Sequence, residues 1–572
     1  MTAQRQPFGR AFYLANGMEI FERLAWYGFF SLSSIYLTSP VSQGGLGFSD
    51  QDRGYIQGMI PFLLYLLPVL TGALADRYGY RRMFLCSFAL MAPGYFLLGQ
   101  VHSFWAFFAV FLLVATGAAC FKPVVVGTVG RCSNDSNRGL AFGVFYTMVN
   151  IGGFLGPLLA GYLRAISWDL VFLLSSCWIL VNVLPAWLWY REPAAAGPDD
   201  RRTLRQVLAD MQLVLGNGRL ALLVLPLLLL LLISPRLTDP WPALWLGALW
   251  LSLNLLWSLL NSGAPVATTT AWYRQPLRAG NRAFVLYLLI LTGYFTAYMQ
   301  LFITMPLYLR DYVNTADLVQ LLAHWLPGSL DYLAAVNVAQ LADALPGFAT
   351  QYQQALPDQQ AIEAVLADIG RQLAHHKIQL PTAVLAQGLT ALQLQQTDAH
   401  VLASDWRALY RQINPEYIVN LGFLTIVLCQ IAISRFIMRW QALPVLVGGT
   451  VLLAFGLMLC GLSATSASGG LLAIAGVWLF SVGEMVTSPK SQEYVAAIAP
   501  PRQTAMYMGY YFVSMALGNL FAGLLSGWAY GYFGAEMQQP VLMWYLFGAI
   551  AVLTAGALCL FQLGLSRKTG SV

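Results

Sequence analysis

Long apolar stretches recur along nearly the whole chain, and no other feature restricts its fold as strongly. A helix needs about 20 mostly apolar residues to cross the hydrocarbon core of a bilayer. Inside that core every backbone polar group must be paired, so only helices and closed barrels can span it. The stretches are continuous rather than alternating, which excludes a barrel. The sequence therefore predicts an all-α membrane protein.

Composition supports the same conclusion. The chain is 58% hydrophobic and only 10% charged, whereas a soluble domain is roughly 45–50% apolar and about 25% charged. Lipid must therefore cover much of the surface. The 7 cysteines are scattered and form no CxxC pair, so we interpret them as packing residues rather than as a disulfide framework or a metal site.

The apolar stretches predict fourteen transmembrane helices, arranged as six, two and six. The first group lies near 11–38, 54–75, 83–101, 104–129, 139–163 and 171–190. The middle pair lies near 219–234 and 241–261. The second group lies near 282–309, 416–437, 442–464, 469–489, 503–528 and 541–563. We expect the first span to be retained, because the segment before it has no cleavable signal pattern.

Basic residues in the loops fix the expected orientation. Loops on the cytoplasmic side of a membrane protein carry an excess of Lys and Arg. With both termini in the cytoplasm, the inner loops hold Arg77, Arg81, Arg82, Arg131, Arg138, Arg191, Arg201, Arg202, Arg205, Arg274, Arg278, Arg282, Arg435, Arg439, Lys490, Arg502, Arg567 and Lys568. The net charge of +6 is thus an orientation signal, and we expect no nucleic-acid partner.

One long polar segment falls on the predicted outer side. Residues 311–415 are rich in Gln and Ala, lack cysteine and have a helical pattern. Four basic and nine acidic residues between Asp311 and Gln412 give a net charge of about −5. We expect an extracytoplasmic helical insert, with isolated surface histidines (His324, His375, His376 and His400) rather than a metal site.

These patterns divide the chain into five regions. They are a first six-helix bundle (1–190), a cytoplasmic linker with two extra helices (191–281), the first helix of the second bundle (282–310), the insert (311–415) and the rest of the second bundle (416–572).

Ionisable residues within spans are costly and often functional. In the first span, Glu19 and Arg23 are i,i+4 neighbours and Glu19 and Glu22 are i,i+3 neighbours, so all three share a helix face. Arg23 can neutralise one acid, while the other keeps a like charge nearby in low dielectric and tends to bind a proton. We predict a site that holds and releases a proton; the alternative is a static ion network.

Lys122 and Glu484 are the most central charges of the two halves. A lone buried charge needs a partner, so we expect these two to face one another across a central cavity. They either pair directly or bind opposite ends of a zwitterionic solute. The alternative is a structural salt bridge between the halves.

Further candidates are a gate and cavity-lining residues. Asp76 lies beside Arg77 and Arg81 in the segment Gly72 to Arg82, an arrangement that can latch neighbouring helices; the alternative is ordinary loop charge. The candidate lining residues are Tyr27, Tyr65, Tyr146 and Asn150. Asn150 is the strongest, because an amide in the middle of a span needs a hydrogen-bond partner.

These residues resemble known family signatures. The segment Gly72 to Arg82 resembles the gating signature of the major facilitator superfamily. Four further motifs resemble the proton-dependent oligopeptide transporter family: Glu19-x-x-Glu22-Arg23 with Tyr27-Gly28, Phe145-Tyr146-x-x-x-Asn150-x-Gly152 with Pro157, Gly483-Glu484 with Ser488-Pro489, and Phe121-Lys122-Pro123 with Asn414-Pro415. The extra pair at 219–261 resembles the two inserted helices of prokaryotic members.

The resemblance implies a major facilitator fold of two six-helix bundles with alternating access to a substrate at the midplane. It implies proton-driven uptake, with protons as the coupling ion and no other cofactor. It assigns proton coupling to Glu19, Glu22 and Arg23. It assigns substrate contact to Tyr65, Lys122, Asn150 and Glu484.

Two departures concern the substrate. Peptide-transporting members usually carry an arginine two residues after the Tyr-Gly pair, where this chain has Phe30, and often an acid in the seventh helix, where the span 282–309 has none. Lys122 can still take a carboxylate and Glu484 an amine. The proton machinery thus looks intact and the peptide clamp incomplete.

We therefore expect a monomeric, proton-coupled symporter of di- or tripeptides or a similar small solute in a cell membrane, most simply the bacterial inner membrane. A carrier or exporter of a non-peptide solute and a transport-like receptor are the alternatives. A membrane-embedded enzyme is disfavoured, because the sequence has no HExxH or GxSxG motif and because its buried charges do not cluster at one depth, as catalytic groups would.

Overall fold

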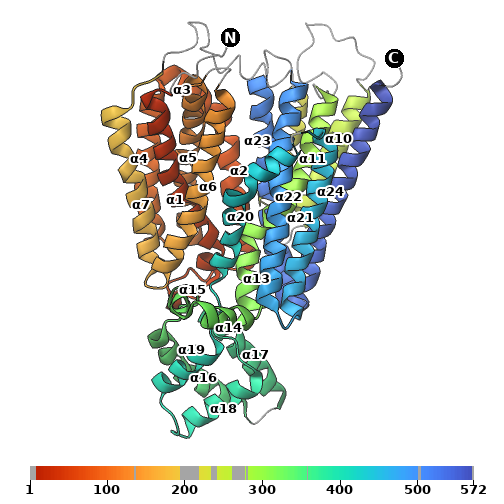
Figure 1. Ribbon diagram of the computed structural model, residues 1–572. Coiled ribbons are helices and arrows are strands. Elements are labelled where there is room, and N and C mark those ends of the chain that lie inside the picture. Colours follow the sequence, from red (N-terminus) through yellow and green to blue (C-terminus); the bar gives the residue numbers. More distant parts are fainter. Residues whose placement is uncertain are drawn as a thin grey trace.

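A computed structural model describes residues 8–133, 137–193, 218–233, 241–260, 277, 281–356, 359–437, 439–499 and 504–569. This part of the chain is almost entirely helical, and its only β-type pairing is an isolated bridge between Ile378 and Arg411. The prediction of an all-α protein is confirmed. Figure 1 shows a bundle of long, roughly parallel helices with a smaller group of short helices at one end.

The described residues of the first half, 8–133 and 137–193, form seven helices and a π-helical turn. They are α1 (Arg10–Thr38), α2 (Asp50–Leu66), α3 (Pro68–Tyr78), α4 (Tyr80–Leu98), α5 (Phe104–Arg131), α6 (Arg138–Arg164), α7 (Trp168–Leu184) and η2 (Pro185–Trp189), with a short turn η1 (Val41–Gln43) after α1. The expected single span 54–75 is wrong in one respect, because the helix divides at Leu67. Pro68 lacks the N–H that would continue the helical ladder.

The second half consists of residues 281–311 and 415–569. Its helices are α11 (Arg282–Tyr298), α12 (Gln300–Ile303), α13 (Met305–Asp311), α20 (Pro415–Ile437), α21 (Ala442–Leu462), α22 (Gly469–Ile498), α23 (Thr504–Ala529) and α24 (Pro540–Thr569), with turns η6 (Ser463–Thr465) and η7 (Tyr530–Glu536). The expected span 282–309 is divided at Met299 and Thr304. The expected tenth span of the two bundles is longer than predicted, because α22 continues through Pro489 to Ile498.

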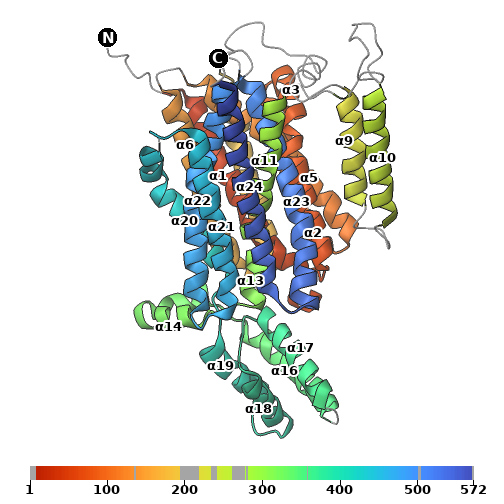
Figure 2. The same ribbon diagram turned by 90° about the vertical axis from the view of Figure 1, so that its right-hand side faces the viewer.

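Fourteen spans stay a prediction. Within the described residues, nine helices are long and apolar enough to cross a membrane. Two shorter apolar helices, α9 (Gly218–Ile233) and α10 (Trp241–Leu260), form the extra pair. They stand beside the bundle next to α2 and α23 (Figure 2).

The insert between α13 and α20 folds around an apolar core of its own. Its helices are α14 (Ala316–Trp325), α15 (Leu330–Leu333), α16 (Val338–Ala355), α17 (Gln359–His375), α18 (Thr382–Gln393) and α19 (Ala399–Tyr410), with a turn η5 (Pro327–Ser329). Leu345, Ile369, Leu389 and Trp406 are buried in this core. The start of α1 and the end of α24 lie at the end of the bundle opposite the insert (Figure 1).

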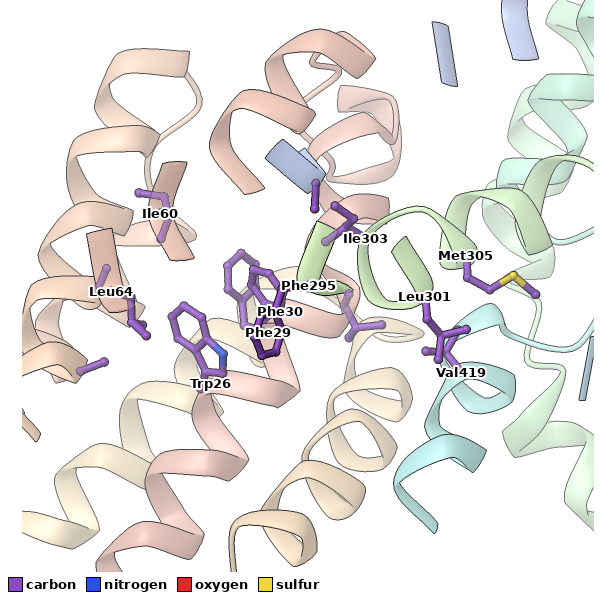
Figure 3. Close-up of a cluster of buried hydrophobic side chains, with 14 of the residues drawn as sticks. Trp26, Phe29, Phe30, Ile60, Leu64, Phe295, Leu301, Ile303, Met305 and Val419 are labelled. Carbon is purple, nitrogen blue, oxygen red and sulfur yellow. The ribbon is translucent and has the colours of Figure 1, made fainter. Parts of the chain in front are cut away.

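The two halves pack closely at the insert end. Glycines bring α2 and α23 together: a Cβ atom added to Gly523 would lie 2.3 Å from the Cα atom of Gly58. Asn420 on α20 donates a hydrogen bond of 2.8 Å to the carbonyl of Phe154 on α6. Apolar side chains of α1, α2, α11–α13 and α20 fill the space between them (Figure 3).

Candidate functional site

The three charges of α1 form one buried cluster. Nε of Arg23 lies 3.2 Å from Oε1 of Glu19, and the same guanidinium contacts the carboxylate of Glu22. Each of the three residues is at most 4% exposed. The cluster forms because residues three and four apart share a helix face. A Cβ atom on Gly152 of α6 would lie 2.4 Å from the Cβ atom of Arg23, so only glycine lets α6 pack this closely against the cluster.

The cluster leaves acceptor atoms open. Among the described residues, Oε2 of Glu19 and Oε1 of Glu22 are buried and have no hydrogen-bond partner. A buried carboxylate oxygen without a donor is costly while it is charged. Adding a proton to either acid converts an unsatisfied acceptor into a donor and removes one of two like charges. The geometry is therefore suited to binding and releasing a proton.

Lys122 of α5 belongs with this cluster. Its ammonium lies 4.1 Å from the centre of the Tyr65 ring, a cation–π distance. The charges that act on it are those of Arg23, Glu22 and Glu19. The guanidinium of Arg23 also lies 5.6 Å from the ring centre of Tyr27. Three of the predicted substrate residues are thus gathered around the predicted proton site.

Glu484 has a partner in its own half. Oη of Tyr298 on α11 donates a hydrogen bond of 2.7 Å to Oε1 of Glu484 on α22. The Tyr298 ring is stacked on Phe480, one helical turn before Glu484, with 5.6 Å between ring centres. Sequence reasoning missed Tyr298, because nothing in the chain near residue 298 points to position 484.

Direct pairing of Lys122 with Glu484 is wrong for this conformation. Within the described part of the chain no ion pair joins them, and each faces partners in its own half. Aromatic contacts connect the two half-sites instead. The Tyr27 ring meets Phe423 of α20 at 5.1 Å between centres, and Tyr65 is stacked on Phe512 of α23 at 6.4 Å. That the two charges bind opposite ends of one solute stays a prediction.

Asn150 satisfies its amide locally. Its Nδ2 donates a hydrogen bond of 2.8 Å to the carbonyl of Tyr146, one turn back on α6. The hydrogen-bond partner that a mid-span amide needs is therefore the backbone of its own helix. Tyr146 is 42% exposed although it lies in the middle of a span. A role of Asn150 in substrate binding stays a prediction.

The predicted gate residues lie where α3 meets α4. The backbone of Asp76 is in α3, but its side chain lies outside the described residues. Arg77 is exposed, with its guanidinium 5.5 Å from the ring of Tyr78. The backbone N–H of Arg81 donates a 3.0 Å hydrogen bond to Glu192, and its guanidinium contacts the carbonyl of Trp187. Arg81 thus ties α4 to η2 and to the segment that follows it, and its role in gating stays a prediction.

Phe30 is a packing residue. It is 5% exposed and stacks on Trp26 with 5.3 Å between ring centres. Figure 3 shows it among apolar side chains from both halves. The position at which the family resemblance leads us to expect an arginine therefore carries no charge here.

Two buried charges at the insert end escaped sequence reasoning. Arg53 of α2 is fully buried, and its Nη1 donates to the carbonyl of Ile303 and to Oγ of Ser526, at 3.1 and 3.0 Å. Arg164 of α6 lies 3.6 Å from Glu416 of α20. All of these contacts join the first half to the second. The residues lie at the ends of the expected spans, where charges are usual and give no signal.

Two of the four insert histidines, His375 and His376, are not isolated on the surface as expected, whereas His324 and His400 are exposed. Gln43, in the loop after α1, donates a 3.0 Å hydrogen bond to Nε2 of His376. His375 is partly buried near Arg310 and Asp311 at the end of α13. Burial lowers the pKa of each imidazole to about 4.

The family model of the Major Facilitator Superfamily matches residues 21–347 and 406–570. The chain belongs to the major facilitator superfamily. With its long apolar helices, it is a multi-pass membrane protein with the major facilitator fold.

Within this superfamily, the curated relatives that the chain resembles include a peptide transporter and a dipeptide and tripeptide permease. A peptide transporter of Yersinia enterocolitica, YePEPT, is 30% identical over 197 residues, which are 32% of this chain and 38% of the relative. Dipeptide and tripeptide permease A of Escherichia coli is 28% identical over 189 residues, 32% of this chain and 36% of the relative. The matches thus span little more than a third of these relatives. Both are transporters and not enzymes.

Solved structures share the fold. A POT family transporter in complex with 5-aminolevulinic acid has a TM-score of 0.62 at 15% identity, covering 96% of each chain. A peptide transporter POT in complex with sulfate has a TM-score of 0.61 at 17% identity, covering 99% of this chain and 97% of the other. Together with the curated relatives, these matches confirm the resemblance to the proton-dependent oligopeptide transporters.

Proposed function

We propose that this protein is a proton-coupled symporter that takes up di- or tripeptides, or a similar small solute, by alternating access. The observation that carries the proposal is the buried Glu19–Glu22–Arg23 cluster, which has open carboxylate oxygens and whose charges act on the ammonium of Lys122. Coupling requires that the acids that bind the proton and the positively charged side chain that binds the solute act on one another electrostatically. Protons are the coupling ion, and no further cofactor is proposed.

The cluster supplies a coupling step. When Glu19 or Glu22 binds a proton, Arg23 loses one of its two anionic partners. The field at Lys122 becomes more positive, which strengthens its attraction for the carboxylate of a solute. Loss of the proton reverses the change. Proton binding and solute binding thus favour one another, as symport requires.

The substrate is proposed to be a zwitterion. Lys122 holds its carboxylate and Glu484 its amine, while Tyr27, Tyr65 and Asn150 line the space between the two half-sites. Peptides and 5-aminolevulinic acid share this pattern of charges, and relatives are named for the former and solved with the latter. Phe30 stands where an arginine would supply a positive charge that favours peptides. A non-peptide zwitterion is therefore the second candidate. A transport-like receptor would bind the same solute without moving it.

The proposed orientation places both termini in the cytoplasm and the insert outside, in the inner membrane of a bacterium, with the protein acting as a monomer. Contacts of Arg53 and Arg164 then close the outer side. Asp76, Arg77 and Arg81 lie on the inner side and form the opposite gate. Exposure of Tyr146 in the middle of α6 agrees with access from the inside.

Uptake into proteoliposomes tests the proposal. An inward proton gradient is imposed, and a labelled dipeptide or labelled 5-aminolevulinic acid is offered outside. Accumulation should depend on the gradient and be lost in Glu22→Gln and Glu484→Gln. It should persist in Glu363→Gln, an exposed acid of the insert.

Three other outcomes separate the candidates. Uptake of 5-aminolevulinic acid alone would support the non-peptide carrier. Solute that binds without accumulating would indicate a receptor. Accumulation that continues in Glu22→Gln would remove the proposed proton site.

A further inference from the structure

An apolar groove lies on the outside of the second half, at the end of the bundle away from the insert. Its volume is about 600 Å³, within the roughly 300–1,000 Å³ of sites that hold small ligands. The groove runs between α20 and α21 and has α22 as its floor. Its lining residues are Ile433, Phe436, Ile437, Trp440, Pro444, Val445, Gly448, Gly449, Leu452, Val482 and Val486.

The groove faces the bilayer rather than the middle of the protein. Phe436 is 66% exposed and Trp440 is 56% exposed at its rim. Val482 and Val486 stand two residues before and after Glu484, and residues two apart lie on nearly opposite faces of a helix. Because Glu484 faces Tyr298 inside the second half, the floor of the groove is the lipid side of the same helix segment.

Glycine creates the space. A Cβ atom on Gly449 would lie 2.2 Å from Oγ1 of Thr487, so at this residue α21 packs directly on α22. A Cβ atom on Gly448 would meet nothing within 4 Å. The pair thus combines a tight contact with an open slot. Lys490 holds the rim by donating a 2.9 Å hydrogen bond to the carbonyl of Trp440.

The charges at the rim are positive. Arg435 and Arg439, next to the lining residues Phe436 and Trp440, are both exposed. The acid on this part of α22, Glu493, is paired with Lys490 at 2.9 Å. Tryptophan is enriched at the level of lipid headgroups, and arginine attracts anionic ones. The rim therefore has the chemistry of a headgroup site and the groove that of an acyl-chain site.

We propose that this groove binds an anionic phospholipid from the leaflet opposite the insert. One acyl chain occupies the slot beside Gly448, against Val482 and Val486. The phosphate lies against the guanidinium groups of Arg435 and Arg439. The bound chain then packs on the back of the helix segment that carries Glu484. The site is separate from the proposed solute site and does not depend on the proposed function.

Native mass spectrometry of the full chain, released from detergent with added phosphatidylglycerol or phosphatidylcholine of the same acyl chains, tests the proposal. The wild-type protein should retain phosphatidylglycerol about tenfold better, because each arginine near an anionic headgroup adds a several-fold gain. Gly448→Leu, which fills the slot, should lose the retained lipid. Gly556→Leu, which adds the same side chain at another exposed glycine with open space, should keep it.

A second variant separates the headgroup from the chain. Arg435→Gln with Arg439→Gln should lower retention of phosphatidylglycerol to the level of phosphatidylcholine, whereas Arg282→Gln, an exposed arginine at the start of α11, should not. Each variant is first compared with the wild type by its melting temperature, and Gly448→Val replaces Gly448→Leu if that variant does not fold. Equal retention of the two lipids by the wild type, or unchanged retention in the filled variant, would overturn the proposal.

Discussion

At the residue scale, the buried charges differ in the origin of their partners. Arg23 meets Glu19 and Glu22 within one helix. Glu484 depends on Tyr298, which is 186 residues away in sequence. The first arrangement follows from helical spacing alone, and the second requires α11 and α22 to pack together. Substitutions at Tyr298 therefore probe how much the packing of the second half contributes to the site.

Tyr298→Phe should weaken solute binding. The substitution keeps the ring on Phe480 but removes the hydrogen bond to Glu484. A hydrogen bond to a charged group is worth about 1.5–3 kcal/mol, so the half-saturation concentration of uptake should rise about tenfold or more. Tyr95→Phe, a buried tyrosine of the first half, is the matched control. An unchanged half-saturation concentration in Tyr298→Phe would show that this hydrogen bond does not orient Glu484.

His376 should make the insert sensitive to acid. Its folded-state pKa of about 4 lies below the ordinary 6.5, mainly because burial disfavours the charged ring and Lys377 adds a like charge. The stability from this depressed pKa is fully present above about pH 6.5 and is lost as the pH falls through about 4. A protonated ring also cannot accept the hydrogen bond from Gln43.

Melting temperatures measured in detergent at about pH 7.5 and pH 5 check this expectation. Between these two pH values, the free energy of unfolding of the wild type should fall by on the order of 1 kcal/mol more than that of His376→Gln, whose residue 376 does not titrate. The melting temperature of the wild type should fall further accordingly. His400→Gln is the control, because His400 is an exposed insert histidine. Equal losses in the wild type and in His376→Gln would assign the acid sensitivity to other groups, such as His375.

At the element scale, a glycine contact brings α2 of the first half and α23 of the second half close together. Gly54 and Gly58 face Gly523 and Gly527, and any Cβ at these positions would clash with the opposite backbone. Small residues allow membrane helices to approach backbone to backbone. The contact closes the insert end of the interface, so a larger side chain there should favour its opening.

Gly523→Leu should separate α2 from α23 at the insert end. Overpacking typically costs about 1–3 kcal/mol, so amide hydrogen exchange in both helices should become about tenfold to a hundredfold faster. Gly509→Leu, on the same helix but with open space around it, is the control. If both variants exchange at the same rate, the glycine contact does not hold the halves together.

At the scale of the whole molecule, the insert is continuous with the second half and yet contacts the first. Tyr332 of α15 lies between Tyr162 of α6 and Tyr417 of α20, with ring centres 5.5 and 5.3 Å away. Its hydroxyl donates a 2.6 Å hydrogen bond to the carbonyl of Leu158. Opening of the insert end must break this arrangement, in addition to the Arg164–Glu416 pair.

Tyr332→Ala should loosen the insert end. Two ring contacts at about 0.5–1.5 kcal/mol each and one hydrogen bond at about 1 kcal/mol are lost. Hydrogen exchange should therefore become faster at the end of α6 and the start of α20. Tyr332→Phe keeps the rings and should show about a third of the effect. Unchanged exchange in the alanine variant would mean that the insert does not restrain the halves.

Features that depend on local spacing could be predicted from the order of residues along the chain. Continuous apolar runs made the chain a helical membrane protein, because unpaired backbone is not tolerated in lipid. The i,i+4 relation placed Arg23 against Glu19. The polar composition of residues 311–415 separated the insert from the spans. Each of these inferences needs only the periodicity of a helix or the solvent that surrounds it.

Contacts between distant residues could be identified only from the packing of the helices in three dimensions. The structure shows that Glu484 is bound by Tyr298, and that Lys122 contacts Tyr65 and is influenced by the charges of the α1 cluster. The sequence alone had left direct pairing of Lys122 with Glu484 open. The structure also showed that Arg53, a residue for which the sequence predicted no role, is fully buried. The physical reason is that these contacts join helices far apart in the chain. No local pattern encodes them, because they depend on how glycines, prolines and aromatic rings set the packing of one helix on another.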